Sequence, residues 1–210
     1  MNDILNFPAF LLASLALCAM PGPDCMYILG RTVAQGKRAG VMSALGITVG
    51  AGGHVLAAAL GLSAFLAASA QAFLVLKYVG AAYLIYLGVQ SFRQRTGHAD
   101  PALLALPPRR DRELFFQGVL TDVLNPKVAL FFLAFLPQFI SPHAQNKVGA
   151  FLLLGVITLA MGLVWDVGLA FFADRIVRRV RGSVAFERLA NRVLGGVLVS
   201  LGLALACEER

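Results

Sequence analysis

The sequence predicts an all-α, polytopic membrane protein with six transmembrane helices. Three observations predict this fold: 59% of the 210 residues are hydrophobic, only 14% are charged, and the apolar residues gather in long runs separated by charged segments. Soluble domains have about 25% charged residues, and a helix needs about 20 apolar residues to cross a bilayer. The composition therefore excludes most soluble enzyme classes and makes the lipid bilayer the expected surroundings of the chain.

The six expected spans are obtained by cutting the chain wherever charges and turn formers interrupt an apolar run. The first run lacks a preceding cationic segment, so we expect a retained span and not a cleaved leader. In the second, Gly46 and Gly50 favour close approach to another helix. Because polar residues interrupt the start of the last run, five spans with a half-inserted sixth are the alternative. In chain order the runs are Ile4 to Gly30, Val41 to Ser69, Phe73 to Phe92, Leu114 to Ile140, Val148 to Ala173, and Leu189 to Ala206.

The chain is expected to form a single transmembrane domain, residues 1–210, made of two halves. The segment 93–113 is the longest connection, and its prolines and arginines indicate a cytoplasmic linker. Repeat one then covers about residues 1–92 and repeat two about residues 114–210. Because each half has three spans, the second half enters the membrane from the opposite side, which predicts two inverted three-helix repeats.

The Lys and Arg residues are distributed unevenly between the loops. The loops after the first, third and fifth spans carry fourteen of the 18, whereas the even loops and the termini carry only Lys147 and Arg210. The positive-inside rule then places the odd loops in the cytoplasm and both termini outside. The formal net charge of +7 is therefore interpreted as an orientation signal, and no nucleic-acid partner is expected.

Two spans are interrupted at matching places. The first contains Pro-Gly-Pro-Asp and the fourth contains Asn-Pro-Lys, so the first and fourth helices are predicted to be broken. Backbone groups left unpaired at a break must face protein or a wet cavity, and breaks at corresponding positions of inverted halves mark a transporter's binding site. Simple kinks without a ligand are the alternative. The residues expected to bind substrate are Pro21, Gly22, Pro23, Asp24, Asn125, Pro126 and Lys127.

Ionisable side chains within the spans are also candidates, because each costs about 2.5 to 3.5 kcal/mol to insert. Lys127 and the half-helix N-termini are expected to attract a carboxylate, while carbonyls freed before the prolines, with Asp24 or Asp122, would receive an ammonium group. A structural ion pair between Lys127 and one acid is the alternative. His54 is also typical of a packing histidine. The proton-coupling candidates are Asp24, Asp122, Asp166 and His54.

Several different short motifs are spread along nearly the whole chain. They are Pro21-Gly22-Pro23; Gly36, Gly40, Gly46 and Gly50; Tyr83-Leu84-Ile85-Tyr86-Leu87-Gly88; Gly118; Asn125-Pro126-Lys127; Phe131-Phe132; and Pro137-Gln138-Phe139. Together they resemble the LysE/RhtB family of bacterial amino-acid exporters. The resemblance implies a secondary transporter that exports amino acids or close derivatives across the bacterial inner membrane, by proton antiport with alternating access. Asp24 departs from the family pattern, which often has Asn at that position.

Other functional classes have weaker support. The three histidines form no His-Glu-x-x-His motif, so no enzyme, metal site or cofactor is expected. A membrane thiol-disulfide carrier is one alternative, because Cys18 and Cys25 flank the first break, and a passive channel is another. The apolar interior favours a neutral over a basic amino acid, while the identity of the substrate and a homo-oligomeric assembly are left open.

The charge distribution generates a test of topology. Single cysteines at Gln71 and Gln145, introduced after the native cysteines are replaced by serine, are expected to react with an impermeant thiol reagent added to intact cells. A cysteine at Arg109 is expected to react only after the cells are permeabilised. Labelling at Arg109 in intact cells would reverse the predicted orientation.

Overall fold

The computed structural model of the chain contains helices as its only regular elements among the residues that it describes. These residues are 3–68, 78–79, 81–82, 85–86, 89, 92–93, 106–182, 189, 192, 195–196, 199–200, 203 and 206. In this part of the chain, β pairing is limited to an isolated antiparallel bridge between Ile4 and Ile140. The predicted all-α class is confirmed.

Eight named helical segments make up the two main described stretches. Five are α-helices of 13 residues or more, and a short α-helix is followed directly by a π-helix and a 3-10 helix. They are α1 (Phe7–Ala19), α2 (Pro23–Gln35), α3 (Lys37–Ala68), α5 (Asp111–Val123), α6 (Pro126–Leu130), η2 (Phe131–Phe135), η3 (Leu136–Phe139) and α7 (Lys147–Gly182).

The first break lies between α1 and α2, which are bent by 50° relative to each other. The backbone is extended at Met20 and Gly22, and α2 begins at Pro23. Proline suits this first helical position because its missing N–H would have no partner there. The helix then continues past the expected end of the span and stops at Gly36, whose φ of 88° favours glycine.

The second break lies between α5 and α6, where the chain bends by 51°. Leu124 ends α5, and Asn125 caps α6 by accepting a hydrogen bond of 3.0 Å from the Lys127 backbone N–H. Pro126 occupies the first turn, as Pro23 does in α2. Both predicted broken helices are therefore confirmed, and the caps and prolines explain where each break falls.

The unbroken helices α3 and α7 are long and apolar enough to cross a membrane, over Lys37–Gly61 and Lys147–Ala173. Each bent pair, taken as one span, is also long and apolar enough to cross a membrane, which gives up to four spans in the described residues. These correspond to the expected first, second, fourth and fifth spans. The expected third and sixth spans and the linker lie largely outside the described residues, so the complete six-helix repeat stays a prediction.

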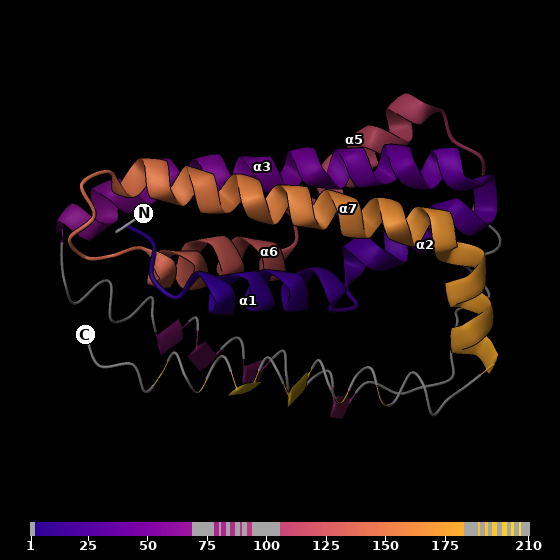
Figure 1. Cartoon of the computed structure of the whole chain (residues 1–210). Coiled ribbons are helices and arrows are strands. Elements are labelled where there is room, and N and C mark those ends of the chain that lie inside the picture. The colour runs from indigo at the N-terminus through magenta and orange to yellow at the C-terminus, as the bar shows by residue number, and fades with distance from the viewer. Residues whose placement is uncertain are drawn as a thin grey trace.

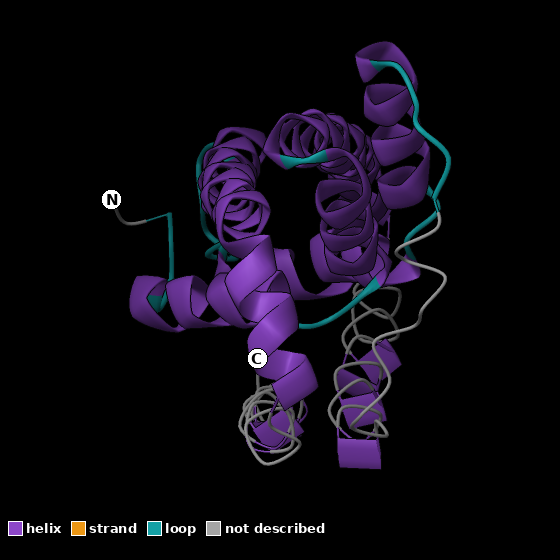
Figure 2. Ribbon diagram, turned by 90° about the vertical axis from the view of Figure 1, so that its right-hand side faces the viewer, coloured by secondary structure: helices purple, strands orange, loops and turns teal. Residues whose placement is uncertain are grey.

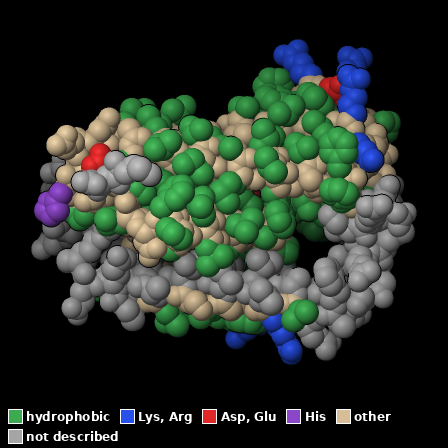
Figure 3. Space-filling view, viewed as in Figure 1, with side chains coloured by type: hydrophobic (Ala, Val, Ile, Leu, Met, Phe, Trp, Pro, Cys, Tyr) green, Lys and Arg blue, Asp and Glu red, His purple; other side chains and the backbone are tan. Residues whose placement is uncertain are grey.

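The elements run lengthwise through one bundle (Figure 1). The pair α1 and α2 crosses it in the opposite direction to α5 and α6, and α3 runs opposite to α7, which is the relation predicted for inverted halves. When the right-hand side of Figure 1 faces the reader, the long helices are seen end on (Figure 2). Hydrophobic side chains cover most of the visible face, and Lys and Arg project where α5 begins (Figure 3). Leu60 and Val164 are each 75% exposed, which suits a lipid surrounding.

Glycines allow α3 to touch the backbone of α5. A Cβ atom at Gly46 would collide with the Phe115 carbonyl group, and one at Gly50 would lie 2.8 Å from the Asp122 Cβ. On the opposite helix, a Cβ at Gly118 would lie 2.6 Å from the Ser43 carbonyl oxygen. The close approach expected from Gly46 and Gly50 is confirmed, and it holds Asp122 against α3.

This packing predicts opposite effects for two substitutions in α3. Gly46→Ala is expected to destabilise the purified protein by roughly 1 to 3 kcal/mol, because the methyl group meets backbone that cannot move aside alone. Gly53→Ala is the matched control, since a Cβ there meets nothing within 4 Å and alanine favours the helix. Thermal unfolding in detergent compares them, and equal midpoints would contradict the close packing.

Candidate functional site

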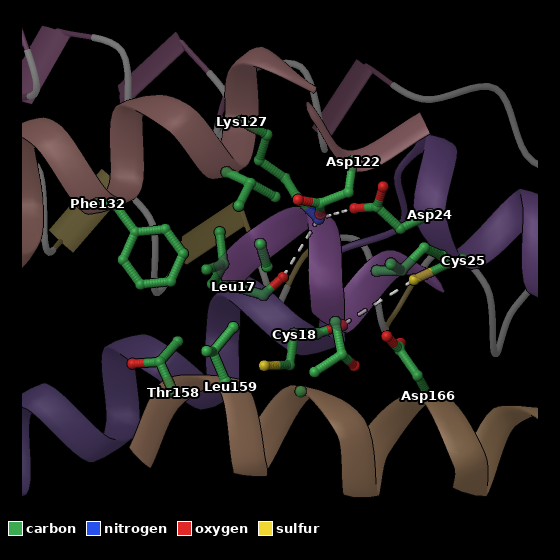
Figure 4. Close-up of a pocket in the computed structure, with 15 residues that line it drawn as sticks. Leu17, Cys18, Asp24, Cys25, Asp122, Lys127, Phe132, Thr158, Leu159 and Asp166 are labelled. Atoms are coloured by element: carbon green, nitrogen blue, oxygen red, sulfur yellow. Dashed lines mark hydrogen bonds and ion pairs between the residues drawn. The ribbon is translucent and has the colours of Figure 1, made fainter. Parts of the chain in front are cut away.

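The two breaks, about a hundred residues apart in sequence, meet in space (Figure 4). Lys127 Nζ at the second break lies 3.8 Å from Asp24 Oδ2 at the first. Asn125 Nδ2 donates a hydrogen bond of 2.6 Å to the same Asp24 oxygen. The structure thus brings predicted residues of both breaks together, and an ion pair and a hydrogen bond join the two broken helices.

Lys127 also bonds to backbone carbonyl groups that the first break leaves without a helical partner. Its ammonium group donates to the Leu17 and Met20 carbonyl oxygens, at 3.4 and 3.3 Å. A Cβ at Gly22 would lie 3.2 Å from Lys127 Nζ, so the absence of a side chain there admits the ammonium group. The carbonyls expected to receive a substrate's ammonium group are occupied here by that of Lys127.

Beside this contact lies a cavity of about 60 Å³ that three carboxylates line. Asp24 comes from α2, Asp122 from α5 and Asp166 from α7, and all three side chains are largely buried. Lys127 is the sole lysine or arginine among the described residues that line the cavity. The cavity wall is therefore more acidic than the apolar sequence led us to expect.

The carboxylates differ in how well they are paired. Among the described residues, Asp24 Oδ1 and Asp122 Oδ2 are buried without a hydrogen-bond partner. Asp122 Oδ2 lies 3.9 Å from His54 Nε2, which also contacts the Asp122 backbone oxygen at 3.1 Å. His54 does not line the cavity, so its contacts fit a packing role beside α5 better than direct access to a ligand.

The two cysteines that flank the first break also lie at this site. Cys18 and Cys25 are free cysteines on opposite sides of the first break, and both line the cavity. Cys25 Sγ donates to the Met20 carbonyl oxygen at 3.7 Å. Pro21, Pro23 and Pro126 shape the breaks and are not among the residues that line the cavity.

An aromatic cluster packs between the cavity and the N-terminal end of the bundle. Phe132 lines the cavity, and Phe131, Phe135 and Phe139 continue along η2 and η3 with ring centroids 5.0 to 5.6 Å apart. Phe10 of α1 meets Phe139 at 5.5 Å. All five are buried, and the π-helical turn that carries part of the cluster is a geometry frequent at functional sites.

The opposite end is held by hydrogen bonds. Arg31 donates to the Pro107 carbonyl oxygen at 3.0 Å and to Gln117 Oε1 at 3.1 Å, and its guanidinium lies 5.8 Å from the centre of the Tyr27 ring. Tyr27 in turn donates to the Leu114 carbonyl oxygen at 2.8 Å. This cluster of Tyr27, Arg31 and Gln117 ties α2 to α5 and to the residues just before it.

Arg31 was expected in a loop, which was wrong: it is 4% exposed and lies in α2. The first span was ended at Gly30 because a charge follows it. Helical spacing from the break would have found Arg31, since it lies seven residues after Asp24 and four after Tyr27, on one face of the helix.

Comparison with known proteins identifies the family. The model of the LysE type translocator family matches residues 15–209. The chain belongs to the LysE family. Among its relatives are a homoserine/homoserine lactone efflux protein of Salmonella typhimurium, 35% identical with 94% of each chain covered, and a leucine efflux protein of Klebsiella pneumoniae, 26% identical with 97% of this chain and 95% of the relative covered. A membrane protein of Vibrio cholerae is 29% identical over 99% of both chains. No solved structure matches this LysE family member.

The junction between the breaks predicts the effect of removing Asn125. Asn125→Ala is expected to destabilise the protein by about 2 kcal/mol or more, because it loses both a helix cap and a buried hydrogen bond to a carboxylate. Pro126→Ala is the neighbouring control, since the N–H that it adds lies where a helix has no partner for it. Thermal unfolding in detergent measures both, and equal losses would show that the cap and the Asp24 contact contribute little.

Proposed function

We propose that this chain is a secondary transporter that exports amino acids or close derivatives, and that its substrate site is the cavity between the two breaks. The observation that carries the proposal is that Lys127 and three carboxylates line one cavity, with Asp24 within 4 Å of Lys127. Charged groups in membrane-spanning segments are costly, and they are therefore usually retained for function. Membership of the LysE family supports it, as do the homoserine and leucine efflux proteins among the relatives.

The site offers both charges that a zwitterion needs. Lys127 is the cation for the substrate carboxylate, and it would exchange its present partner Asp24 for that carboxylate when substrate enters. Asp24, which loses that partner, is one acid suited to carry the proton. Asp122, which has an unpaired oxygen in the same cavity, is the other acid suited to carry the proton. Asp166 and then His54 follow as proton-coupling candidates.

Alternating access fits the way in which the cavity is enclosed. A volume of about 60 Å³ is far below the roughly 300 to 1,000 Å³ of common ligand sites, so the site must widen to hold an amino acid. The aromatic cluster and the cluster of Tyr27, Arg31 and Gln117 enclose it from opposite ends with different chemistry. Opening one cluster while the other stays closed would expose the site to one side at a time.

The cation-rich end is proposed to face the cytoplasm. Arg31, Lys37, Arg38 and the arginines before α5 gather there, while the N-terminal residues and the segment before α7 lie at the other end (Figure 1). In a bacterial inner membrane, Tyr27, Arg31 and Gln117 would then form the inner gate. The aromatic cluster would form the outer gate through which substrate leaves.

Three variants in proteoliposomes test this function, with labelled homoserine and leucine as probes. Lys127→Met is expected to abolish counterflow, because the carboxylate loses the fixed cation of the cavity. Asp24→Asn or Asp122→Asn, whichever removes the proton carrier, is expected to retain counterflow but to lose acceleration by a pH gradient.

A variant with Cys18, Cys25 and Cys207 replaced by serine is the control for the thiol-carrier alternative and is expected to transport normally. Normal counterflow by Lys127→Met would show that the carboxylate is held by other groups. If Asp24→Asn and Asp122→Asn both keep full pH-driven flux, the proton is carried elsewhere.

A further inference from the structure

The charges around the cavity do not balance within the described residues. Three carboxylates face one lysine, and Lys127 directs its ammonium group to Asp24 and to two α1 carbonyls. Asp122 has His54 within 4 Å, although that pair is ionic only when the histidine is protonated. Asp166 is the carboxylate that this network does not include.

Asp166 is more than nine-tenths buried, with an exposed fraction of 8%. It makes no hydrogen bond or ion pair with the described part of the chain, although its neighbours in the cavity are charged. Figure 4 shows its carboxylate pointing from α7 toward the cavity, across from the helices that carry Asp122 and Lys127. The Asp166 oxygens are not among the sealed, unpartnered polar atoms of the described residues, so the carboxylate is open to the cavity that it lines. An ammonium group is the partner that best compensates a carboxylate removed from bulk water.

The helix face that carries Asp166 continues to line the cavity over two further turns. Gly162, one turn earlier, also lines the cavity, and a Cβ there would meet only Cys18 Sγ, at 3.8 Å. Thr158 and Leu159 lie about one turn before Gly162 on the same helix, and they face Phe132 of η2. The α7 wall of the cavity thus runs from a carboxylate, past a small residue, to an apolar region with one hydroxyl group.

We propose that Asp166 binds the ammonium group of the substrate, while Lys127 on the opposite side of the cavity binds its carboxylate. The proposal rests on the proposed function, because it divides the two ends of the ligand within that same site. The side chain of the ligand then extends toward Phe132, Thr158 and Leu159, which suits small neutral side chains, including hydroxylated ones. Since α7 has no break, Asp166 is a fixed reference point, whereas Lys127 lies at a bend.

The test uses direct binding to the purified protein and two analogues that each carry one end of homoserine. One is the amino alcohol that lacks the carboxyl group, and the other is γ-hydroxybutyrate, which lacks the amine. In Asp166→Asn, the Kd of the amino alcohol measured by calorimetry is expected to rise roughly tenfold or more, while that of γ-hydroxybutyrate stays unchanged. Lys127→Met is expected to give the reverse pattern, and Asp166→Glu should restore amine binding in part.

Asp111→Asn is the matched control, because Asp111 pairs with Arg38 at the cation-rich end, away from the cavity. It is expected to bind both analogues as the wild type does. Equal amino-alcohol affinity in the wild type and Asp166→Asn overturns the proposal, as does an equal loss of both analogues, which indicates general damage to the site. Asp166-dependent amine binding without counterflow of homoserine or leucine would support the ammonium site and contradict only the proposed transport.

Discussion

Lys127 pairs with the backbone carbonyl groups and the carboxylate that are buried where the helices break. In a bilayer, a helix that breaks at mid-depth frees carbonyl groups that have no water to bond, and each costs several kcal/mol if it stays unpaired. The ammonium group of Lys127 donates hydrogen bonds to the carbonyl oxygens of Leu17 and Met20 at the end of α1. It also forms an ion pair with the carboxylate of Asp24. Lys127 itself is held by Asn125, which caps its helix. The break between α1 and α2 is therefore stabilised by a residue from the break between α5 and α6.

The two ends of the bundle close around this junction by different physical means. Phenylalanine rings in edge-on and tilted contact at the N-terminal end contribute apolar contact that is weakly directional, so they can slide and repack without losing a specific bond. At the other end, Arg31, Tyr27 and Gln117 use oriented hydrogen bonds, which break as a set when the helices separate. In the proposed transport cycle, the first end would open gradually and the second would switch between two states.

The helices α3 and α7 provide the fixed frame against which the broken pairs are placed. Contacts through Gly46, Gly50 and Gly118 bring α3 and α5 to backbone distance, and this contact presses Asp122 against α3. On the other side, α7 presents Asp166 from an unbroken helix of 36 residues. A charge pattern that spans four helices is therefore stabilised mainly by packing between helices, since the carboxylates themselves repel one another.

The sequence by itself determined the membrane class, four of the spans that the structure describes, and the position of both breaks. Apolar run length and proline chemistry are local properties, so one chain suffices to recognise them. Only the tertiary structure decided that Lys127 pairs with Asp24 and the α1 carbonyls, that His54 faces the α5 backbone, and that Arg31 is buried inside α2. These contacts join residues as much as 110 positions apart, and their partners depend on how the helices rotate and approach. Helix rotation is set by small residues and by the shapes of neighbouring side chains, which composition and spacing along one chain do not specify.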